Sequence, residues 1–143
     1  MTDQPQQFTI GANVQHLTIA EVAAENPDYR KVLWTGRHSQ IVAMTIPAGE
    51  EIGAEVHEHG DQILTFISGT GHADLAGETH AIGPGDQCAV PAGTEHNFRN
   101  TGTEPLVLYT VYSPPEHAAD AQFATKAAAD RAEQIGADAP PQA

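Results

Sequence analysis

The sequence predicts an all-β protein, either an antiparallel sandwich or a barrel. Between residues 31 and 113, short runs rich in β-branched and aromatic residues follow one another, with Gly, Pro and Asn between them. Many short strands separated by turn residues are typical of antiparallel β folds. Within the runs at 39–46 and 106–112, successive side chains fall into two alternating sets, as on the two faces of a sheet.

Helices are predicted only near the two ends. Residues 18–29 can form a short helix, because Thr18 stands three residues before Glu21 as in a capping box and Pro27 ends the stretch. Residues 116–135 are rich in Ala, which is a strong helix former, and contain few large apolar side chains. We expect this second helix to pack lightly.

The length of 143 residues fits one compact domain. We divide it into an N-terminal segment (1–30), a β-barrel (31–115) and a C-terminal helix with a frayed tail (116–143). Cys88 is the only cysteine, so an intramolecular disulfide is excluded. The first ten residues have neither the basic start nor the apolar run of a signal peptide, and we therefore expect a cytoplasmic protein.

The chain is strongly acidic. Nineteen Asp and Glu residues against six Lys and Arg give a formal net charge of -13. Such a field repels phosphate backbones and anionic lipids, so we expect neither nucleic acid nor membrane surfaces as partners. Adaptation to high salt and plain solubility also fit this acidity. The eight histidines point elsewhere, because imidazole is the commonest metal ligand, and two of them lie in the stretch EVHEHGDQ at residues 55–62.

Two segments resemble the two sequence motifs of the cupin superfamily. Every fixed position of the second motif is matched at the family's spacing, by Gly85, Pro91, Gly93, His96 and Asn100. The spacing of the first motif is also kept, with two residue types changed, at Gly49, Glu55, His57, Gln62 and Gly69. The resemblance covers roughly residues 35–113. It implies the cupin jelly-roll β-barrel, in agreement with the strand pattern.

The resemblance also implies a set of metal ligands inside the barrel. The four ligand positions of the family map onto Glu55, His57, Gln62 and His96. Residues 55 and 57 are two positions apart, so on one strand their side chains lie on the same face and both can point inward. Pairing His57 with His59 instead would lose the spacing to Gln62 and to Gly49. We therefore interpret His59 as a turn residue or as a group behind the ligands.

This ligand set has a chemical consequence. Two imidazoles, one carboxylate and one amide carry the same total charge as the three imidazoles and one carboxylate of the family. Two His with one carboxylate is the combination found in non-haem iron oxygenases, and oxygen donors also suit manganese. We expect one divalent metal, Fe or Mn in preference to Zn, Ni or Cu. Loss of the metal through the two exchanges is the alternative.

The leading functional hypothesis is a metal-dependent enzyme that acts on a small oxygen-rich substrate by dioxygenase-type chemistry. A metal-dependent isomerase or decarboxylase is one alternative, and a non-catalytic barrel that binds a small molecule or sugar is another. Tyr109 and His59 are the candidates for a catalytic role, and Cys88 is more simply a core residue. We assign no role to His16, His38, His72, His80 and His117. The partners expected are the substrate and, in a homodimer, a second copy of the chain.

Overall fold

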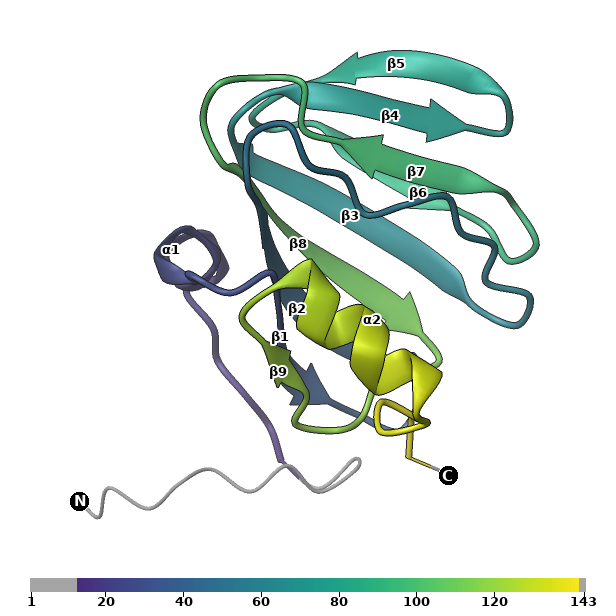
Figure 1. Ribbon diagram of the computed structural model, residues 1–143. Coiled ribbons are helices and arrows are strands. Elements are labelled where there is room, and N and C mark those ends of the chain that lie inside the picture. Colours follow the sequence, from purple (N-terminus) through teal and green to yellow (C-terminus); the bar gives the residue numbers. More distant parts are fainter. Residues whose placement is uncertain (1–12, 142–143) are drawn as a thin grey trace.

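The computed structural model describes residues 13–141, which form two antiparallel sheets around one core (Figure 1). The helices are α1 (Ile19–Glu25) and α2 (Lys126–Gln134). The strands are β1 (Arg30–Thr35), β2 (Gln40–Ile46), β3 (Asp61–Ser68), β4 (Gly71–Leu75), β5 (Glu78–Ile82), β6 (Gln87–Val90), β7 (His96–Arg99), β8 (Leu106–Ser113) and β9 (Gln122–Phe123). The large sheet has the order β6-β3-β8-β2-β1-β9 and the small sheet β5-β4-β7. The predicted all-β jelly-roll fold with a helix near each end is confirmed.

The core lies between the two sheets and is filled by the inward rows of the strands. Burial alternates along β3 and along the second half of β8, the latter within the predicted run 106–112, and Phe66 of the large sheet packs against Phe98 of the small one, with ring centroids 5.8 Å apart. The inward rows become polar at one end, where Gln62 of β3 stands opposite Tyr112 of β8. This polar end of the core is where the candidate site lies.

The N-terminal helix is shorter than predicted. Thr18 occupies the N-cap position of α1, but its side chain makes no capping hydrogen bond, so the predicted capping box does not form. The helix ends at Glu25 because Asn26 is extended and its side chain bonds both backbone groups of Asp28. α1 packs on the large sheet, mainly against β8, with Ala23 buried.

The C-terminal helix also differs from the prediction, which placed it over residues 116–135. It begins only at Lys126, where Thr125 caps the helix by accepting a hydrogen bond from the Ala128 backbone N–H. Upstream, the buried Gln40 side chain accepts hydrogen bonds from two backbone N–H groups and donates to the His117 carbonyl, and β9 pairs with β1. These contacts satisfy the backbone without a helix, so tertiary structure overrides the Ala-rich propensity.

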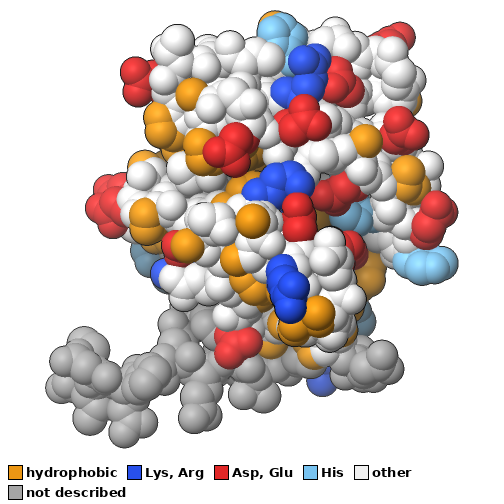
Figure 2. Space-filling view, in the orientation of Figure 1, with side chains coloured by type: hydrophobic (Ala, Val, Ile, Leu, Met, Phe, Trp, Pro, Cys, Tyr) orange, Lys and Arg blue, Asp and Glu red, His pale blue; other side chains and the backbone are white. Residues whose placement is uncertain are grey.

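The chain that follows α2 is anchored at Asp138. Asp138 is buried, and its carboxylate contacts His117, Arg30 and the backbone N–H of Ala118. The C-terminal segment is therefore held against the start of β1 in the large sheet. No helix within residues 13–141 has the length and apolar character needed to cross a membrane. Acidic side chains are spread over the face seen in Figure 2 instead of gathering in one patch.

Candidate metal centre

Three of the four predicted ligands converge at the polar end of the core. One ligand atom from each of Glu55, His57 and His96 lies within 4.8 Å of the others. The backbone explains the convergence, because Glu55 and His96 exchange two N–H···O hydrogen bonds of 2.9 and 3.0 Å, which ties the segment before β3 to the start of β7. The two imidazole centroids are 5.1 Å apart.

Both imidazoles are oriented by an acceptor at Nδ1. His96 Nδ1 lies 2.9 Å from the Thr94 carbonyl oxygen, and His57 Nδ1 lies 3.2 Å from Glu116 Oε1. A carbonyl or carboxylate oxygen can only accept, so each Nδ1 carries a proton and each Nε2 is available to a cation. A metal-binding histidine in proteins is commonly fixed by an acceptor of this kind.

Gln62, the fourth predicted ligand, is buried with an unused acceptor. Its Nε2 donates to Thr110 Oγ1 at 3.1 Å, while Oε1 has no hydrogen-bond partner among the described residues. His57 Nε2 is likewise buried without a hydrogen bond of acceptable angle, although Glu55 Oε2 lies 3.0 Å away. A buried acceptor without a partner is costly and calls for an explanation. A divalent cation held by Glu55, His57 and His96 would satisfy His57 Nε2, so the residues present fit a metal.

The charges at the site are coupled. Glu116 and Glu55 raise the pKa of His57 to about 10, although burial acts in the opposite direction. Burial raises the pKa of Glu55, but His57, Arg30 and His96 outweigh it and hold that pKa below its ordinary value. Both shifts favour a proton on His57 and an ionised Glu55 when no metal is bound. A divalent cation would take the place of that proton.

A cavity of about 420 Å³ opens beside Glu55 and His57, while Gln62 and His96 are not among its lining residues. Its charged and polar walls include Arg30, Glu55, His57, Glu116, His117 and Lys126. This volume lies in the range of small-molecule sites. Two walls meet here, one from the segment that carries Glu55 and His57 and the other from the C-terminal segment and α2.

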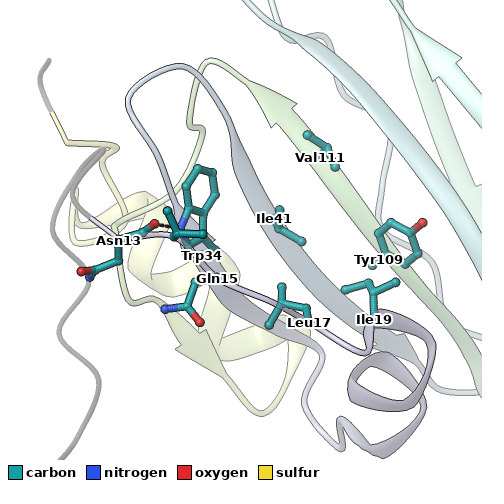
Figure 3. A pocket seen from close by; sticks show the side chains of 9 residues that line it. Asn13, Gln15, Leu17, Ile19, Trp34, Ile41, Tyr109 and Val111 are labelled. Atoms are coloured by element: carbon teal, nitrogen blue, oxygen red, sulfur yellow. Dashed lines mark hydrogen bonds between the residues drawn. The ribbon is translucent and has the colours of Figure 1, made fainter.

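The two residues predicted as catalytic candidates lie elsewhere. His59 is exposed in the turn before β3 and is not among the residues that line the cavity. Tyr109 faces the outer side of the large sheet, where it lines a separate apolar cavity of about 690 Å³ with Trp34 and Ile41 (Figure 3). The inward tyrosine of β8 is Tyr112, whose ring meets the His57 ring edge-on at a centroid distance of 5.8 Å.

Four residues at the cavity were missed by the sequence reasoning: Arg30, Glu116, His117 and Asp138. Three of them fall in the segment that was predicted as helix and tail. The sequence around His117 matches no motif that would assign it a role. Its partner Asp138 lies 21 residues away. No local pattern marks such a pair.

The comparisons with known proteins agree with this architecture. The model of the Cupin domain family matches residues 42–112. The chain belongs to the cupin domain family. This cupin is 35% identical over 135 residues to the uncharacterized protein YrkC of Bacillus subtilis, a match that covers 90% of the chain and 69% of YrkC. It is also similar to the crystal structure of BH2720 from Bacillus halodurans, with a TM-score of 0.83 and 36% identity over 85% of this chain and 96% of that one.

A more distant relative of this cupin is an enzyme. The 5-nitrosalicylic acid 1,2-dioxygenase of Bradyrhizobium sp. is 34% identical over 68 residues, which is 47% of this chain and 32% of that enzyme. The match thus spans about a third of the dioxygenase. The cupin therefore has distant enzymatic relatives.

Proposed function

We propose that this cupin is a metal-dependent enzyme that oxidises a small oxygen-rich organic substrate with dioxygen. The observation that carries the proposal is the donor set of two imidazoles, a carboxylate and a buried amide oxygen without a hydrogen-bond partner in the described part of the chain. Two His with one carboxylate is typical of non-haem iron oxygenases, and the added oxygen donor also suits manganese. We therefore assign Fe or Mn to the site in preference to Zn, Ni or Cu.

Each residue of the site has a distinct task in this proposal. Glu55, His57, Gln62 and His96 would hold the metal, which when bound supplies redox and Lewis-acid chemistry. Glu116 keeps the His57 ring in place from behind. The cavity walls shield the substrate from bulk water. The distant similarity to a dioxygenase supports oxidative chemistry as the first choice.

Metal content tests the ligand assignment. The protein is purified without chelators and its metal measured by elemental analysis, together with the variants His57→Ala and His59→Ala. We expect stoichiometric Fe or Mn in the wild type, loss of the metal in His57→Ala, and retention in His59→Ala. His59 is the matched control, because it lies two residues away and is exposed. The reverse pattern would show that the ligand assignment is wrong.

Oxygen uptake tests the reaction class. The Fe(II)-loaded protein is incubated with a panel of hydroxylated aromatic acids and small enediols, and dioxygen consumption is followed with an electrode. We expect uptake that requires both substrate and metal and is lost in His57→Ala. Substrate conversion without oxygen uptake would favour an isomerase or decarboxylase. A wild type without metal, together with no effect of Glu55→Ala on metal affinity, would favour a non-catalytic binding protein.

A further inference from the structure

A second group of polar side chains lines the same cavity as Glu55 and His57, two of the four candidate metal ligands. His117, Asp138 and Arg30 form this group, which comes from the C-terminal segment and the start of β1. Asp138 joins the other two, since its Oδ2 lies 2.7 Å from His117 Nδ1 and 3.6 Å from an Arg30 guanidinium nitrogen. The side chains of His117 and Asp138 are only 9% and 3% exposed.

Asp138 fixes which nitrogen of His117 is free. The carboxylate accepts, so in the neutral imidazole Nδ1 carries the proton and Nε2 holds the lone pair. This Nε2 is buried and has no hydrogen-bond partner among residues 13–141. The backbone of His117 is held as well, because the buried Gln40 side chain accepts from its N–H at 2.9 Å and donates to its carbonyl at 2.9 Å. A His with a carboxylate behind it and a free nitrogen in front has the geometry of a general base.

Arg30 supplies the complementary donor. Its side chain is 7% exposed, and its Nε–H is buried without a hydrogen-bond partner in the described part of the chain. Arg30 stays charged at any working pH, so it can stabilise a negative charge that forms beside it. His117 and Arg30, both paired with the Asp138 carboxylate, thus line the cavity together with Glu55 and His57, and each keeps one polar atom without a hydrogen-bond partner among residues 13–141.

The charges around the cavity indicate what kind of substrate fits. The acidic lining residues are Glu55, Glu116, Asp130, Glu133 and Asp138, against the cations Arg30 and Lys126. Carboxylates are in excess, so the walls disfavour a substrate that arrives with several negative charges. A neutral hydroxyl that loses its proton only after binding avoids this repulsion.

We propose that His117, oriented by Asp138, is the catalytic base of this cupin and takes the proton from a phenol-type or enediol hydroxyl of the substrate. The inference rests on the proposed function, since it assumes that the substrate binds beside the metal ligands. In this step the substrate O–H bond breaks and its proton moves to His117 Nε2. The electron pair stays on the substrate oxygen, where Arg30 stabilises the charge. No oxidation or reduction occurs in the step.

The test uses 4-nitrocatechol as a probe, because its visible spectrum distinguishes the neutral, singly ionised and doubly ionised forms. The probe is titrated anaerobically into the Fe(II)-loaded wild type and into His117→Gln, whose amide can still donate to Asp138. We expect the wild type to bind the doubly ionised probe near neutral pH. His117→Gln should bind it about ten-fold to a hundred-fold more weakly, as expected for loss of a hydrogen bond to a charged group, and should ionise it only at higher pH. His59→Gln is the control and should match the wild type.

Metal analysis on the same samples separates the two possible failures. If the wild type and His117→Gln hold equal Fe and ionise the probe with the same pH profile, the base assignment is overturned and the proposed function stands. Iron-loaded wild type that leaves the probe un-ionised overturns the assignment in the same way. A wild type that takes up no iron overturns the proposed function and this inference together. A merely structural role for His117 would change stability but leave the pH profile of the bound probe unchanged.

Discussion

Replacing Gln62 and Thr110 together by Leu and Val should make the metal-free protein more stable and the metal weaker. Both side chains are buried, and the amide donates to the Thr hydroxyl while its Oε1 has no hydrogen-bond partner within residues 13–141. Removing both partners of a buried hydrogen bond with apolar groups of similar shape is nearly neutral. Removing the unpartnered oxygen also removes its desolvation penalty of about 1–3 kcal/mol, which stabilises the folded protein. We therefore expect the free energy of unfolding to rise by about 1–2 kcal/mol.

The same double variant loses one metal donor. Loss even of a group behind a ligand lowers metal affinity about ten-fold to a hundred-fold, so we expect at least that effect here. At a fixed metal concentration, a ten-fold weaker affinity reduces the metal-dependent gain in stability by about 1.4 kcal/mol. Denaturant unfolding with and without chelator measures both quantities, and a chelator competition gives the affinity directly.

The control for this experiment is another Gln and Thr pair on the same sheet. Gln87 Nε2 donates to Thr65 Oγ1 at 2.9 Å, but this pair is exposed and lies away from the ligands. Gln87→Leu with Thr65→Val should change stability by no more than about 0.5 kcal/mol and leave metal affinity intact. If the Gln62 and Thr110 variant is destabilised without metal and binds metal normally, then Gln62 is a structural residue and the reasoning is refuted.

Three further outcomes follow from the same contacts. Glu116→Gln should lower metal affinity about ten-fold to a hundred-fold in a chelator competition with little change in unfolding, because it weakens the acceptor behind His57. Asp138→Asn should lower the free energy of unfolding by about 1–3 kcal/mol at neutral pH. Burial raises the pKa of Asp138, but His117, the Ala118 N–H and Arg30 outweigh burial, so the pKa in the folded protein lies below that in the unfolded chain. The stabilisation by ionised Asp138 is fully present above its pKa in the unfolded chain and is lost as the pH falls through its pKa in the folded protein. The unfolding curves of the wild type and the variant should therefore converge in acid. Gln62→Glu should destabilise the chelator-treated protein, and added Fe(II) or Mn(II) should restore it more than in the wild type, as thermal melts can show.

The sequence was informative where function depends on spacing along the chain. Glu55, His57 and His96 converge as the motif spacing implies, because a jelly roll with this spacing places the two segments side by side. The alternation of side chains along a strand also indicates which tyrosine faces the core. It assigns Tyr109 to the face opposite Leu108 and Thr110, so the same alternation that located the strands could have replaced Tyr109 by Tyr112 as the tyrosine near the site.

The sequence did not predict the half of the cavity that is formed by tertiary contacts of the C-terminal segment. The C-terminal segment has high helix propensity, yet the Gln40 side chain and pairing with β1 hold residues 116–123 in a different conformation. His117 and Asp138 are brought together by the return of the chain after α2. Neither contact leaves a periodic signal. Propensity and periodicity describe local structure, and this half of the cavity is built from long-range contacts.

The exchange of ligand types between positions 55 and 62 has a physical reason in the structure. Position 62 is deep, with 3% of the residue exposed and the Thr110 hydroxyl as the hydrogen-bond partner found for its side chain. A carboxylate there would be a buried charge without compensation whenever the metal is absent. Position 55 lies at the cavity wall, where a third of the side chain is exposed and His57 and Arg30 lower its pKa. Placing the carboxylate at 55 and the neutral amide at 62 keeps the ligand charge that a divalent metal needs, and it moves that charge to the position where the metal-free protein can best tolerate it.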